Sequence, residues 1–489
     1  MKLPAHKTKI VCTIGPASRS EAVLEKLMER GMSVARLNFA HGTLEGHGED
    51  MRRIRAVAAR LGRRCLIIAD LPGPKIRVGT LSDEPLLLEQ GDRVTLTTRK
   101  VLGTCDRIPV EYERLPQSVS PGSLIFLNDG FIQLQAERIL GDEVICRILI
   151  GGPLLSHKGL NLPGVKALGD AVSHRDLEFV DFGLQHGIDT FTVSFTETAG
   201  DILKVKQFAK GRGRSVRVVA KIERAEAVDN IDGILEAADA IMIARGDLGV
   251  QIPLEDVPLV QKKIIHKANV LGRPVITATQ MLVSMTENIR PTRAEVSDVA
   301  NAILDGTDAV MLSEETAIGR YPVESVEMMA RIAASAEREC EAIRALSDLR
   351  AYFRERASAG KASAKDVVSL SAVEAAEALG AGFILTDTHS DPRLISRFKP
   401  GCWILSFQGA EKADHLLNLS YGVFPVHVAG ETSSQLEVMV GFVENSRLAG
   451  AGDRMVLVEG ARADDKNAVE SLRVLRSDKD GGTMECHGR

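Results

Sequence analysis

Paired cysteines and long apolar runs are both missing from this chain. Its seven cysteines are odd in number, scattered and never spaced as Cys-x-x-Cys, which indicates neither a disulfide framework nor a zinc site. No run approaches the roughly 18 apolar residues that span a bilayer, and no apolar segment precedes a small-residue cleavage site near the start. We therefore expect a cytoplasmic protein with no membrane partner.

An excess of positive charge is missing as well. The chain has 61 lysines and arginines against 66 aspartates and glutamates, a formal net charge of −5. Such a balance provides no general basic field, so we expect no nucleic-acid partner, and any anionic substrate must be held by local cations. With 489 residues and 44% hydrophobic content, the chain exceeds what one core needs, which predicts two or three domains.

Apolar, β-branched runs alternate with amphipathic stretches along the chain. One such stretch, 18–30, has hydroxyls for an N-cap and Gly31 just past its end. Eight strand–helix units predict an α/β protein with a closed (β/α)₈ barrel, whose strands are apolar on both faces. An open doubly wound sheet would bring a Gly-rich turn after the first strand, and "TIGPAS" lacks that spacing. The eight candidate strands end at Gly15, Phe39, Asp70, Phe195, Glu223, Asp247, Gln280 and Thr316.

The spacing of these strand ends predicts an inserted domain. Successive ends are 24 to 36 residues apart, except for a gap of 125 residues between Asp70 and Phe195. Turns at 128–130 and 141–142 within the gap are typical of hairpins in a small β-barrel or sandwich. After about residue 340 an open α/β alternation resumes. We expect barrel segments at 1–70 and 167–340, a β-domain lid at 71–166, a C-terminal α/β domain at 341–489, a linker within 348–366 and a frayed tail at 476–489.

Polar residues occur where the barrel strands end, and barrel enzymes keep their sites there. Because strand side chains alternate, Lys221 and Glu223 share one face, as do Arg36 and Asn38. Any one of these residues could equally well be a solvated or salt-bridged group at a strand end. That interpretation does not account for polar residues at the ends of several strands together. The candidate set is Arg36, Asn38, Asp70, Lys221, Glu223, Asp247, Thr277, Thr279, Gln280, Ser313, Glu314 and Glu315.

Two carboxylates in this set are candidate metal ligands. Glu223 and Asp247, expected from adjacent strands, offer two oxygens to a hard divalent cation such as Mg²⁺. An internal ion pair of Glu223 with Lys221 or Arg245 is an equally good interpretation. Gly246 lets a ligand approach the backbone closely, or else it only serves the turn.

A family resemblance covers residues 8 to about 335 and becomes weaker after that. The segments "KIVCTIGPAS", "VARLNFAHG", "GLNLPG", "ARGDLGVQIP", "ITATQML", "RPTRAEVSDVANAILDGTDAVMLSEETAIGRYP" and "LISRFKP" resemble pyruvate kinase. The resemblance implies a (β/α)₈ barrel interrupted after its third strand by a β-domain lid and followed by an α/β domain. It also implies a homotetramer that moves the phosphoryl group of phosphoenolpyruvate to ADP in glycolysis, with Mg²⁺ or Mn²⁺ at Glu223 and Asp247.

Individual roles follow from the same resemblance. Lys221 matches the catalytic lysine that stabilises charge on the phosphoryl group and the enolate, and Thr279 matches the threonine implicated in protonating the enolate. Arg36 and Arg77 match phosphate-contacting arginines. Arg77 and Lys158 match nucleotide-contacting positions, and a solvated lid charge is the competing interpretation of Lys158. The expected substrate-binding residues are Arg36, Lys221, Gly246, Asp247 and Thr279, and the expected nucleotide-binding residues are Arg77, Lys158, Asn38 and His41.

The segment "ADLPGPKIR" at 69–77 departs from many members of the family, which hold K⁺ with Asn, Ser, Asp and Thr and place Glu after the Pro-Gly-Pro turn. Asn38 and Asp70 are kept here, but the other three positions are Ala40, Leu71 and Lys75. We predict that the ammonium of Lys75 acts as a built-in cation, so that K⁺ is not required. A surface charge on the lid hinge is the competing interpretation.

The C-terminal domain departs further. "THSDPR" at 388–393 replaces a Ser/Thr-Gly-rich loop, Asp391 stands where a hydroxyl would meet phosphate, and Pro392 removes an N–H. We expect no fructose bisphosphate activation of the usual kind. Two other functions fit parts of the pattern: a metal-dependent aldolase-type barrel for pyruvate enolate, which lacks the lid, and a degenerate non-catalytic paralogue, which needs a broken site. The sequence indicates neither the nucleotide preference nor the role of Glu314.

Overall fold

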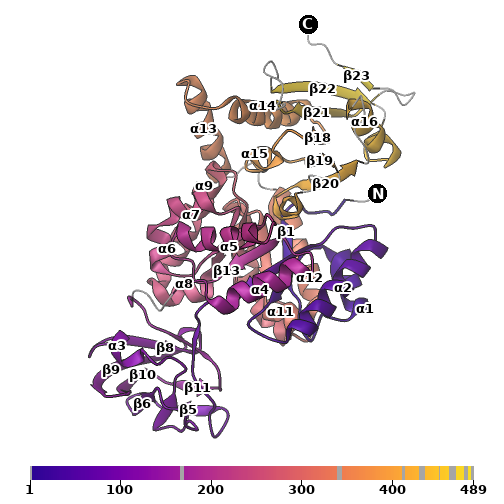
Figure 1. Ribbon diagram of the computed structural model, residues 1–489. Coiled ribbons are helices and arrows are strands. Elements are labelled where there is room, and N and C mark those ends of the chain that lie inside the picture. Colours follow the sequence, from indigo (N-terminus) through magenta and orange to yellow (C-terminus); the bar gives the residue numbers. More distant parts are fainter. Residues whose placement is uncertain are drawn as a thin grey trace.

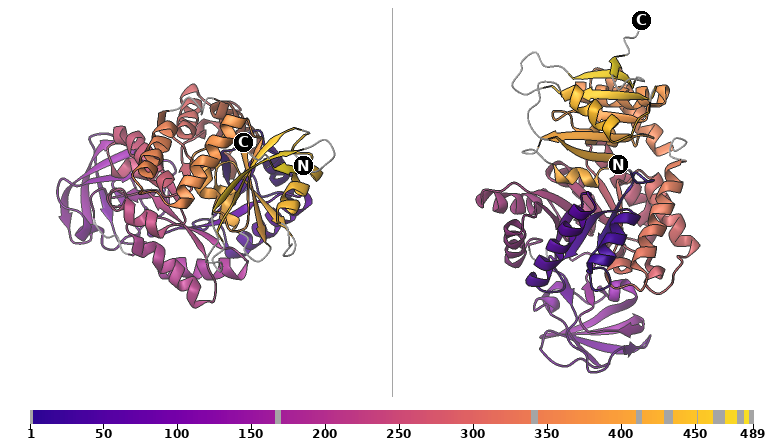
Figure 2. Two further views of the ribbon diagram at one scale, coloured as in Figure 1. Left: turned by 90° about the horizontal axis from the view of Figure 1, so that it is seen from above. Right: turned by 90° about the vertical axis from the view of Figure 1, so that its right-hand side faces the viewer.

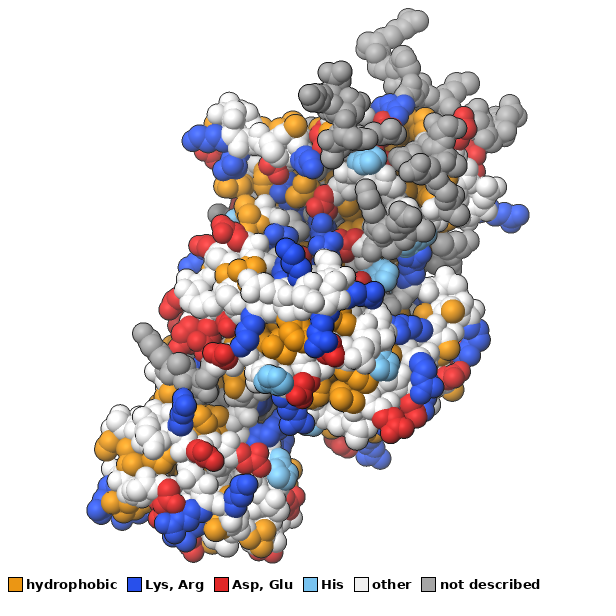
Figure 3. Space-filling model, viewed as in Figure 1, with side chains coloured by type: hydrophobic (Ala, Val, Ile, Leu, Met, Phe, Trp, Pro, Cys, Tyr) orange, Lys and Arg blue, Asp and Glu red, His pale blue; other side chains and the backbone are white. Residues whose placement is uncertain are grey.

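The computed structural model describes residues 3–165, 170–338, 344–409, 414–428, 435–450, 452–461, 470–477 and 483–485. Three parts follow one another along the long axis of the molecule: a β-rich lid, a central barrel and a C-terminal α/β domain (Figures 1 and 2). The N-terminal end lies where the barrel meets the C-terminal domain (Figure 1). Charges of both signs are interspersed over the face shown in Figure 3. Among the described residues, no helix is long and apolar enough to cross a membrane.

Eight parallel strands close the central barrel in the order β1-β17-β16-β15-β14-β13-β3-β2, which confirms the predicted architecture. The strands are β1 (Lys9–Thr13), β2 (Met32–Asn38), β3 (Leu66–Leu71), β13 (Thr190–Val193), β14 (Arg217–Ile222), β15 (Ala240–Ala244), β16 (Val275–Ala278) and β17 (Ala309–Leu312). Two predicted strand ends were wrong. The chain leaves β15 at Ala244 and β17 at Leu312 to enter short helices, so Asp247 lies in α8 (Arg245–Gln251) and Thr316 in α11 (Glu314–Ala317).

Helices cover the outside of the barrel. The helix predicted from residue 18 begins at Glu21, because Ser20 is its N-cap and accepts a hydrogen bond from the N–H of Val23. Gly31 ends it with φ +129°, where a Cβ would lie 2.5 Å from Nε2 of His6, so only glycine fits. The helical elements here are α1 (Glu21–Arg30), α2 (Leu44–Arg60), α4 (His174–Gln185), α5 (Ala199–Gly211), α6 (Ala225–Asp229), α7 (Ile231–Ala237), η2 (Leu254–Asp256), α9 (Val257–Val270), η3 (Val283–Thr286), α10 (Arg293–Leu304) and α12 (Pro322–Arg338).

The barrel interior is filled with apolar side chains at one end only. Val34, Val219 and Met242 pack there with Leu416 and Leu419 of η6 (His415–Leu419), which comes from the C-terminal domain. This plug closes the end of the barrel where the strands begin. The opposite end, where the strands finish and polar side chains replace apolar ones, faces the lid (Figure 1).

The lid is a seven-stranded sheet in the order β4-β12-β8-β9-β10-β6-β7 together with a two-stranded sheet of β11 and β5. Both predicted turns lie between antiparallel strands, at 128–130 between β8 and β9 and at 141–142 between β9 and β10. Its first strand, β4, pairs with its last, β12, so a two-stranded stem carries the lid. The elements are β4 (Ile76–Arg77), β5 (Leu86–Leu88), β6 (Arg93–Thr97), β7 (Arg107–Pro109), α3 (Leu115–Ser118), β8 (Leu124–Leu127), η1 (Asn128–Gly130), β9 (Ile132–Leu140), β10 (Glu143–Ile150), β11 (Gly152–Leu154) and β12 (Gly159–Asn161).

The C-terminal domain has a six-stranded sheet in the order β20-β19-β18-β21-β22-β23, and β22 and β23 run antiparallel to their neighbours. The predicted linker is mostly helical and packs on the C-terminal domain: 348–358 lies in α13, 364–366 begins α14, and Leu349 and Phe353 are buried in the core of this domain. The predicted frayed tail was wrong for 476–477 and 483–485, which are strand residues. The elements are α13 (Arg344–Ser358), α14 (Ala364–Leu379), β18 (Phe383–Thr386), α15 (Pro392–Ser396), β19 (Trp403–Gly409), β20 (Val423–Val428), α16 (Gln435–Asn445), β21 (Arg454–Glu459), β22 (Ser471–Ser477) and β23 (Thr483–Glu485).

The domain limits that we expected from the sequence stay predictions. Residues 166 and 340, where two of these limits fall, lie outside the described residues.

Candidate active site

A buried ion network lies at the open end of the barrel, on β2 and β3. The guanidinium of Arg36 donates from Nε to Oδ2 of Asp70 at 2.8 Å and from a second nitrogen to the same oxygen, while its Nη1 donates to Thr13 at 2.9 Å. Thr192, on β13, donates its hydroxyl to the other oxygen of Asp70. Burial alone would raise the pKa of Asp70, but Arg36, Lys221 and these hydrogen bonds outweigh burial and hold the pKa below its usual value.

Lys221 on β14 lies between two carboxylates. Its Nζ is 2.9 Å from Glu223, 3.6 Å from Asp70 and 2.7 Å from the hydroxyl of Ser194. Burial lowers the pKa of Lys221, but the attraction of Asp70 and Glu223 is larger in sum and raises the pKa above its ordinary value. The side chain is therefore a fixed cation at the barrel mouth, although only 8% of the residue is exposed.

Glu223 and Asp247 were predicted on strands, but Glu223 follows β14 directly and Asp247 lies in the first turn of α8. They remain close enough to repel each other: burial raises the pKa of Glu223, the charge of Asp247 raises it further, and Lys221 opposes both. The N–H of Phe195 donates to the second oxygen of Glu223 at 2.7 Å. Two adjoining carboxylates that repel each other are a chemically suitable pair of ligands for a hard divalent cation.

The protein offers such a cation few other ligands. Among the described residues, no group of three histidine, cysteine, aspartate or glutamate side chains converges as a metal site. Water and substrate would fill the remaining positions, an arrangement that Mg²⁺ commonly adopts. Of the two ion pairs that the sequence left open, the one between Glu223 and Lys221 forms, whereas Arg245 pairs with Asp298 instead.

Lys75 reaches the site from the lid hinge. Its Nζ lies 3.1 Å from Oδ1 of Asp247, and the two side chains are 24% and 20% exposed. Before it in the hinge, Gly73 adopts φ +64° and lies so close to Ser194 and Phe195 that a Cβ would come within 3.2 Å of both. The hinge therefore contacts the same β13 corner that holds Lys221 and Glu223.

Thr279 lies in a strained turn after β16. It has φ +66° and the next residue has φ +53°, values that non-glycine residues, above all β-branched ones, rarely adopt. Arg245 donates to the carbonyl oxygens of Ala278 at 3.2 Å and Thr279 at 2.8 Å, and both oxygens of Asp298 bind its guanidinium at 2.6 Å. The hydroxyl of Thr279 accepts the N–H of Gly246 at 2.8 Å. These contacts fix the threonine beside α8.

The candidate nucleotide-binding residues lie at the junction of barrel and lid. Arg77 donates to the carbonyl oxygen of His157 at 2.8 Å, and the carbonyl of Lys158 accepts the N–H of Val78 at 3.0 Å, so both cations flank the lid stem. Burial lowers the pKa of His41, and the charges of Arg77, Arg36 and Lys75 lower it further. Asn38, at the end of β2, accepts the N–H of Ala40 at 3.1 Å through its side-chain oxygen.

Not every predicted residue joins this cluster. Thr277 was wrongly placed at the mouth: Ile276 and Ala278 face the barrel interior, so Thr277 faces the helices and binds the hydroxyl of Thr307 at 3.1 Å. Glu315 is buried and accepts the N–H groups of Leu282 and Ser313, which ties two loops together. The side chains of Gln280 and Glu314 are exposed, and Ser313 is the N-cap of α11.

Sequence reasoning missed the residues that hold the others in place. Thr192 and Ser194 contact Asp70 and Lys221, and both belong to the predicted strand "DTFTVSF", where their two-residue spacing was an available signal. Asp298 carried no such signal, because it lies in α10 and meets Arg245 only through the tertiary fold.

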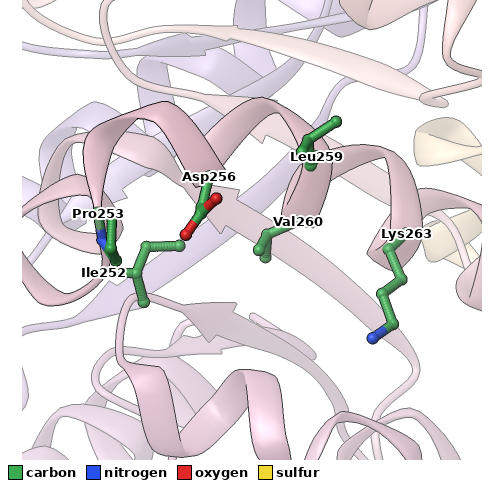
Figure 4. Close-up of a pocket in the computed structure, with 6 residues that line it drawn as sticks. All are labelled: Ile252, Pro253, Asp256, Leu259, Val260 and Lys263. Atoms are coloured by element: carbon green, nitrogen blue, oxygen red, sulfur yellow. The ribbon is translucent and has the colours of Figure 1, made fainter.

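A separate pocket lies on the outer surface of the barrel, around α9 and the turn before it (Figure 4). Its lining residues are Ile252, Pro253, Asp256, Leu259, Val260 and Lys263. None of the candidate site residues lines it. This pocket lacks the convergent carboxylates and cations found at the barrel mouth.

Comparison with known proteins relates nearly the whole chain to one family. Residues 5–326 match the model of the pyruvate kinase barrel domain, and residues 366–475 match that of the pyruvate kinase alpha/beta domain. A pyruvate kinase of Thermococcus litoralis is 47% identical over 97% of this chain and 100% of its own length. A pyruvate kinase of Geobacillus stearothermophilus is 42% identical, and one of Staphylococcus aureus 41%, each over 96% of this chain and 80% of its own length.

Proposed function

This chain belongs to the pyruvate kinase family, and we propose that the ion network at its barrel mouth performs the family's reaction. The enzyme is a phosphotransferase of glycolysis that moves the phosphoryl group of phosphoenolpyruvate to ADP, giving pyruvate and ATP. Members of the family generally depend on Mg²⁺. In this proposal each step of the reaction belongs to individual residues of the network.

Lys221 carries the proposal, because it is a fixed cation at the open barrel end with carboxylates on two sides. As the P–O bond of phosphoenolpyruvate breaks, negative charge develops on the phosphoryl oxygens and on the enolate oxygen. A preorganised ammonium stabilises that charge without reorganisation during the reaction. The ion pairs with Asp70 and Glu223 hold the Lys221 amine in its charged form throughout.

Arg36 and Thr279 complete the substrate site in this proposal. Arg36, oriented by Asp70 and Thr13, contacts the substrate phosphate. A water held by the hydroxyl of Thr279 delivers a proton to the methylene carbon of the enolate, which becomes pyruvate, and the hydroxide left behind takes up a proton from solvent. The Gly246 N–H and the clamp of Arg245 on its backbone set the direction of the threonine hydroxyl.

Glu223 and Asp247 are the proposed metal ligands. A divalent cation bound there would neutralise charge on the transferred phosphoryl group and on the enolate oxygen. Phe195 fixes one oxygen of Glu223 through its N–H, so the pair is presented in a defined orientation. Gly246 keeps the backbone beside Asp247 accessible to the substrate.

Arg77, Lys158, Asn38 and His41 form the proposed nucleotide side of the site. Arg77 and Lys158 lie on the lid stem and supply positive charge for the phosphates of ADP. Burial is the main cause of the lowered pKa of His41, and the charges of Arg77, Arg36 and Lys75 lower it further, which supports a group of cations beside this histidine. The stem position also lets closure of the lid bring these charges onto the nucleotide.

We further propose that no K⁺ is needed. Both oxygens of Asp70 are taken by Arg36, Thr192 and Lys221, and the side-chain oxygen of Asn38 accepts the N–H of Ala40. Ala40 and Leu71 offer no side-chain oxygen. The charge of Lys75 lowers the pKa of His41, as do those of Arg36 and Arg77, so the three cations lie near one another. In this proposal the ammonium of Lys75 supplies the positive charge at the substrate phosphate.

The two rival functions are less well supported. An aldolase-type barrel needs neither the inserted lid nor its cations, and a degenerate paralogue needs a broken site, whereas Lys221, Glu223, Asp247 and Thr279 are all present. A homotetramer in the cytoplasm is the assembly and location that we propose from the family resemblance.

Neutral replacement of Lys221 tests the assignment. In Lys221→Gln the steady-state rate of pyruvate formation from phosphoenolpyruvate and ADP should fall by about a thousandfold. Lys26→Gln, on the exposed surface of α1, is the matched control and should keep the wild-type rate. Fluorescence of the single tryptophan, Trp403, checks that each variant is folded. A Lys221→Gln rate within tenfold of wild type would remove the lysine from the mechanism.

A further inference from the structure

We propose that Lys75 is a placeholder for the divalent cation: it pairs with Asp247 in the metal-free enzyme and leaves it when metal binds, which releases the lid hinge. This inference rests on the proposed function, in which Asp247 is a metal ligand. It assigns Lys75 a second position, distinct from its contact with substrate phosphate. The site thereby links metal occupancy to the position of the lid.

The ion pair directly connects the lid hinge to a helix of the barrel. Lys75 directly precedes β4, the first strand of the lid, whereas Asp247 lies in α8 of the barrel. The 3.1 Å contact is partly exposed, and an ion pair of that kind is weak and readily exchanged. A metal with twice the charge therefore displaces the ammonium at modest cost.

A second lid contact reaches the same helix. Gly130 of η1 lies against Val250 of α8, where a Cβ on the glycine would be 3.3 Å from the valine side chain. The lid therefore contacts α8 twice: Lys75 contacts Asp247 in the first turn of the helix, and Gly130 contacts Val250 near its last residue. Loss of the ion pair at Asp247 therefore removes one of the contacts between the lid and α8.

The lid strand β12 provides the space in which the Lys75 side chain lies. A Cβ added to Gly159 would come within 2.8 Å of Cε of Lys75, closer than real contacts allow. The atom in conflict belongs to the flexible end of a lysine, so a methyl group would displace the side chain rather than the backbone. Gly159→Ala thus moves the ammonium without removing its charge.

The hinge also contacts the residues that orient Glu223, the other proposed metal ligand. Gly73 packs on Ser194 and Phe195, and the N–H of Phe195 holds Glu223. The mutual repulsion of Glu223 and Asp247 is offset in this state by two ammonium groups, one from Lys221 and one from Lys75. Lys221 is buried and fixed, which leaves Lys75 as the partner that can be exchanged for a metal ion.

Binding of Mn²⁺ to the full-length, substrate-free protein tests the proposal, with free Mn²⁺ followed by electron paramagnetic resonance. Removing a competing cation should strengthen binding, so Lys75→Met should lower the dissociation constant about three- to fivefold. Gly159→Ala should also lower it. Lys100→Met makes the same change of net charge on the exposed lid surface and should leave the constant unchanged.

A second measurement separates this inference from the proposed function. In the presence of saturating metal, Lys75→Met should bind phosphoenolpyruvate more weakly, the opposite sign to its effect on Mn²⁺. Unchanged or weaker Mn²⁺ binding by Lys75→Met overturns the placeholder, whatever happens to the substrate. Tighter Mn²⁺ binding with unchanged substrate binding supports the placeholder and removes Lys75 from the phosphate site.

Discussion

Raising the pH should stabilise this protein through one buried lysine. Lys9 begins β1 at the plugged end of the barrel, where it is 7% exposed and its Nζ donates to the carbonyl oxygen of Val423 at 2.7 Å. The ammonium also lies 5.1 Å from the ring centre of Trp403. Burial lowers the pKa of Lys9 from its ordinary value of 10.5 to about 8, although Glu337 and Asp308 act in the opposite direction.

The size of the effect follows from this difference in pKa. Between about pH 8 and pH 10.5 the unfolded chain binds a proton that the folded chain has released, so stability rises with pH. At about 1.4 kcal/mol for each unit of pKa, the charged amine costs the folded state about 3 kcal/mol at low pH. About 2 kcal/mol of this cost should disappear between pH 8 and pH 10.

The assay is urea denaturation at both pH values, followed by fluorescence of Trp403, the single tryptophan of the chain. Other groups titrate in the same range, so the comparison with Lys9→Met isolates the lysine. That variant should show a pH-dependent gain smaller than wild type by about 2 kcal/mol. Lys26→Met should keep the wild-type gain. Equal gains in wild type and Lys9→Met would refute the reasoning.

Three further predictions concern the site and its regulation. Asp298→Asn loosens the clamp of Arg245 on the Thr279 turn, so kcat should fall about ten- to a hundredfold with little change in KM for phosphoenolpyruvate; a rise in KM alone would contradict the clamp. Asp391 already caps α15 and pairs with Arg393 at 2.9 Å, so fructose bisphosphate should leave the substrate saturation curve in place, and a shift of that curve would show an effector site there. Lys158→Met should raise KM for ADP more than KM for phosphoenolpyruvate, and the reverse pattern would place the lysine elsewhere.

Periodicity in the sequence was sufficient for the barrel because its strands are apolar on both faces. The same reasoning put polar residues at the strand ends, and the ion pairs among Arg36, Asp70, Lys221 and Glu223 confirm that these residues converge. It failed for Thr277, because a run of polar and apolar residues in "PVITATQ" does not show which alternate set faces the barrel.

The remaining errors have tertiary causes. The segment 348–366 looks like a charged linker, but Leu349 and Phe353 bury one helical stripe against the C-terminal core. The start of the polar tail is part of a strand because Ser471–Ser477 pairs with the free edge of β21 in antiparallel orientation. The contact between Lys75 and Asp247 joins residues 172 positions apart, which no local pattern could predict.

The most direct test of the proposed chemistry is pyruvate formation from phosphoenolpyruvate and ADP with Mg²⁺, in a buffer whose only monovalent cation is bulky and non-coordinating. The measurement is then repeated with K⁺ added. We predict the same activity in both conditions, because the ammonium of Lys75 replaces the ion. Activity only with K⁺ would contradict that role, and no activity in either condition would contradict the assignment of the catalytic residues.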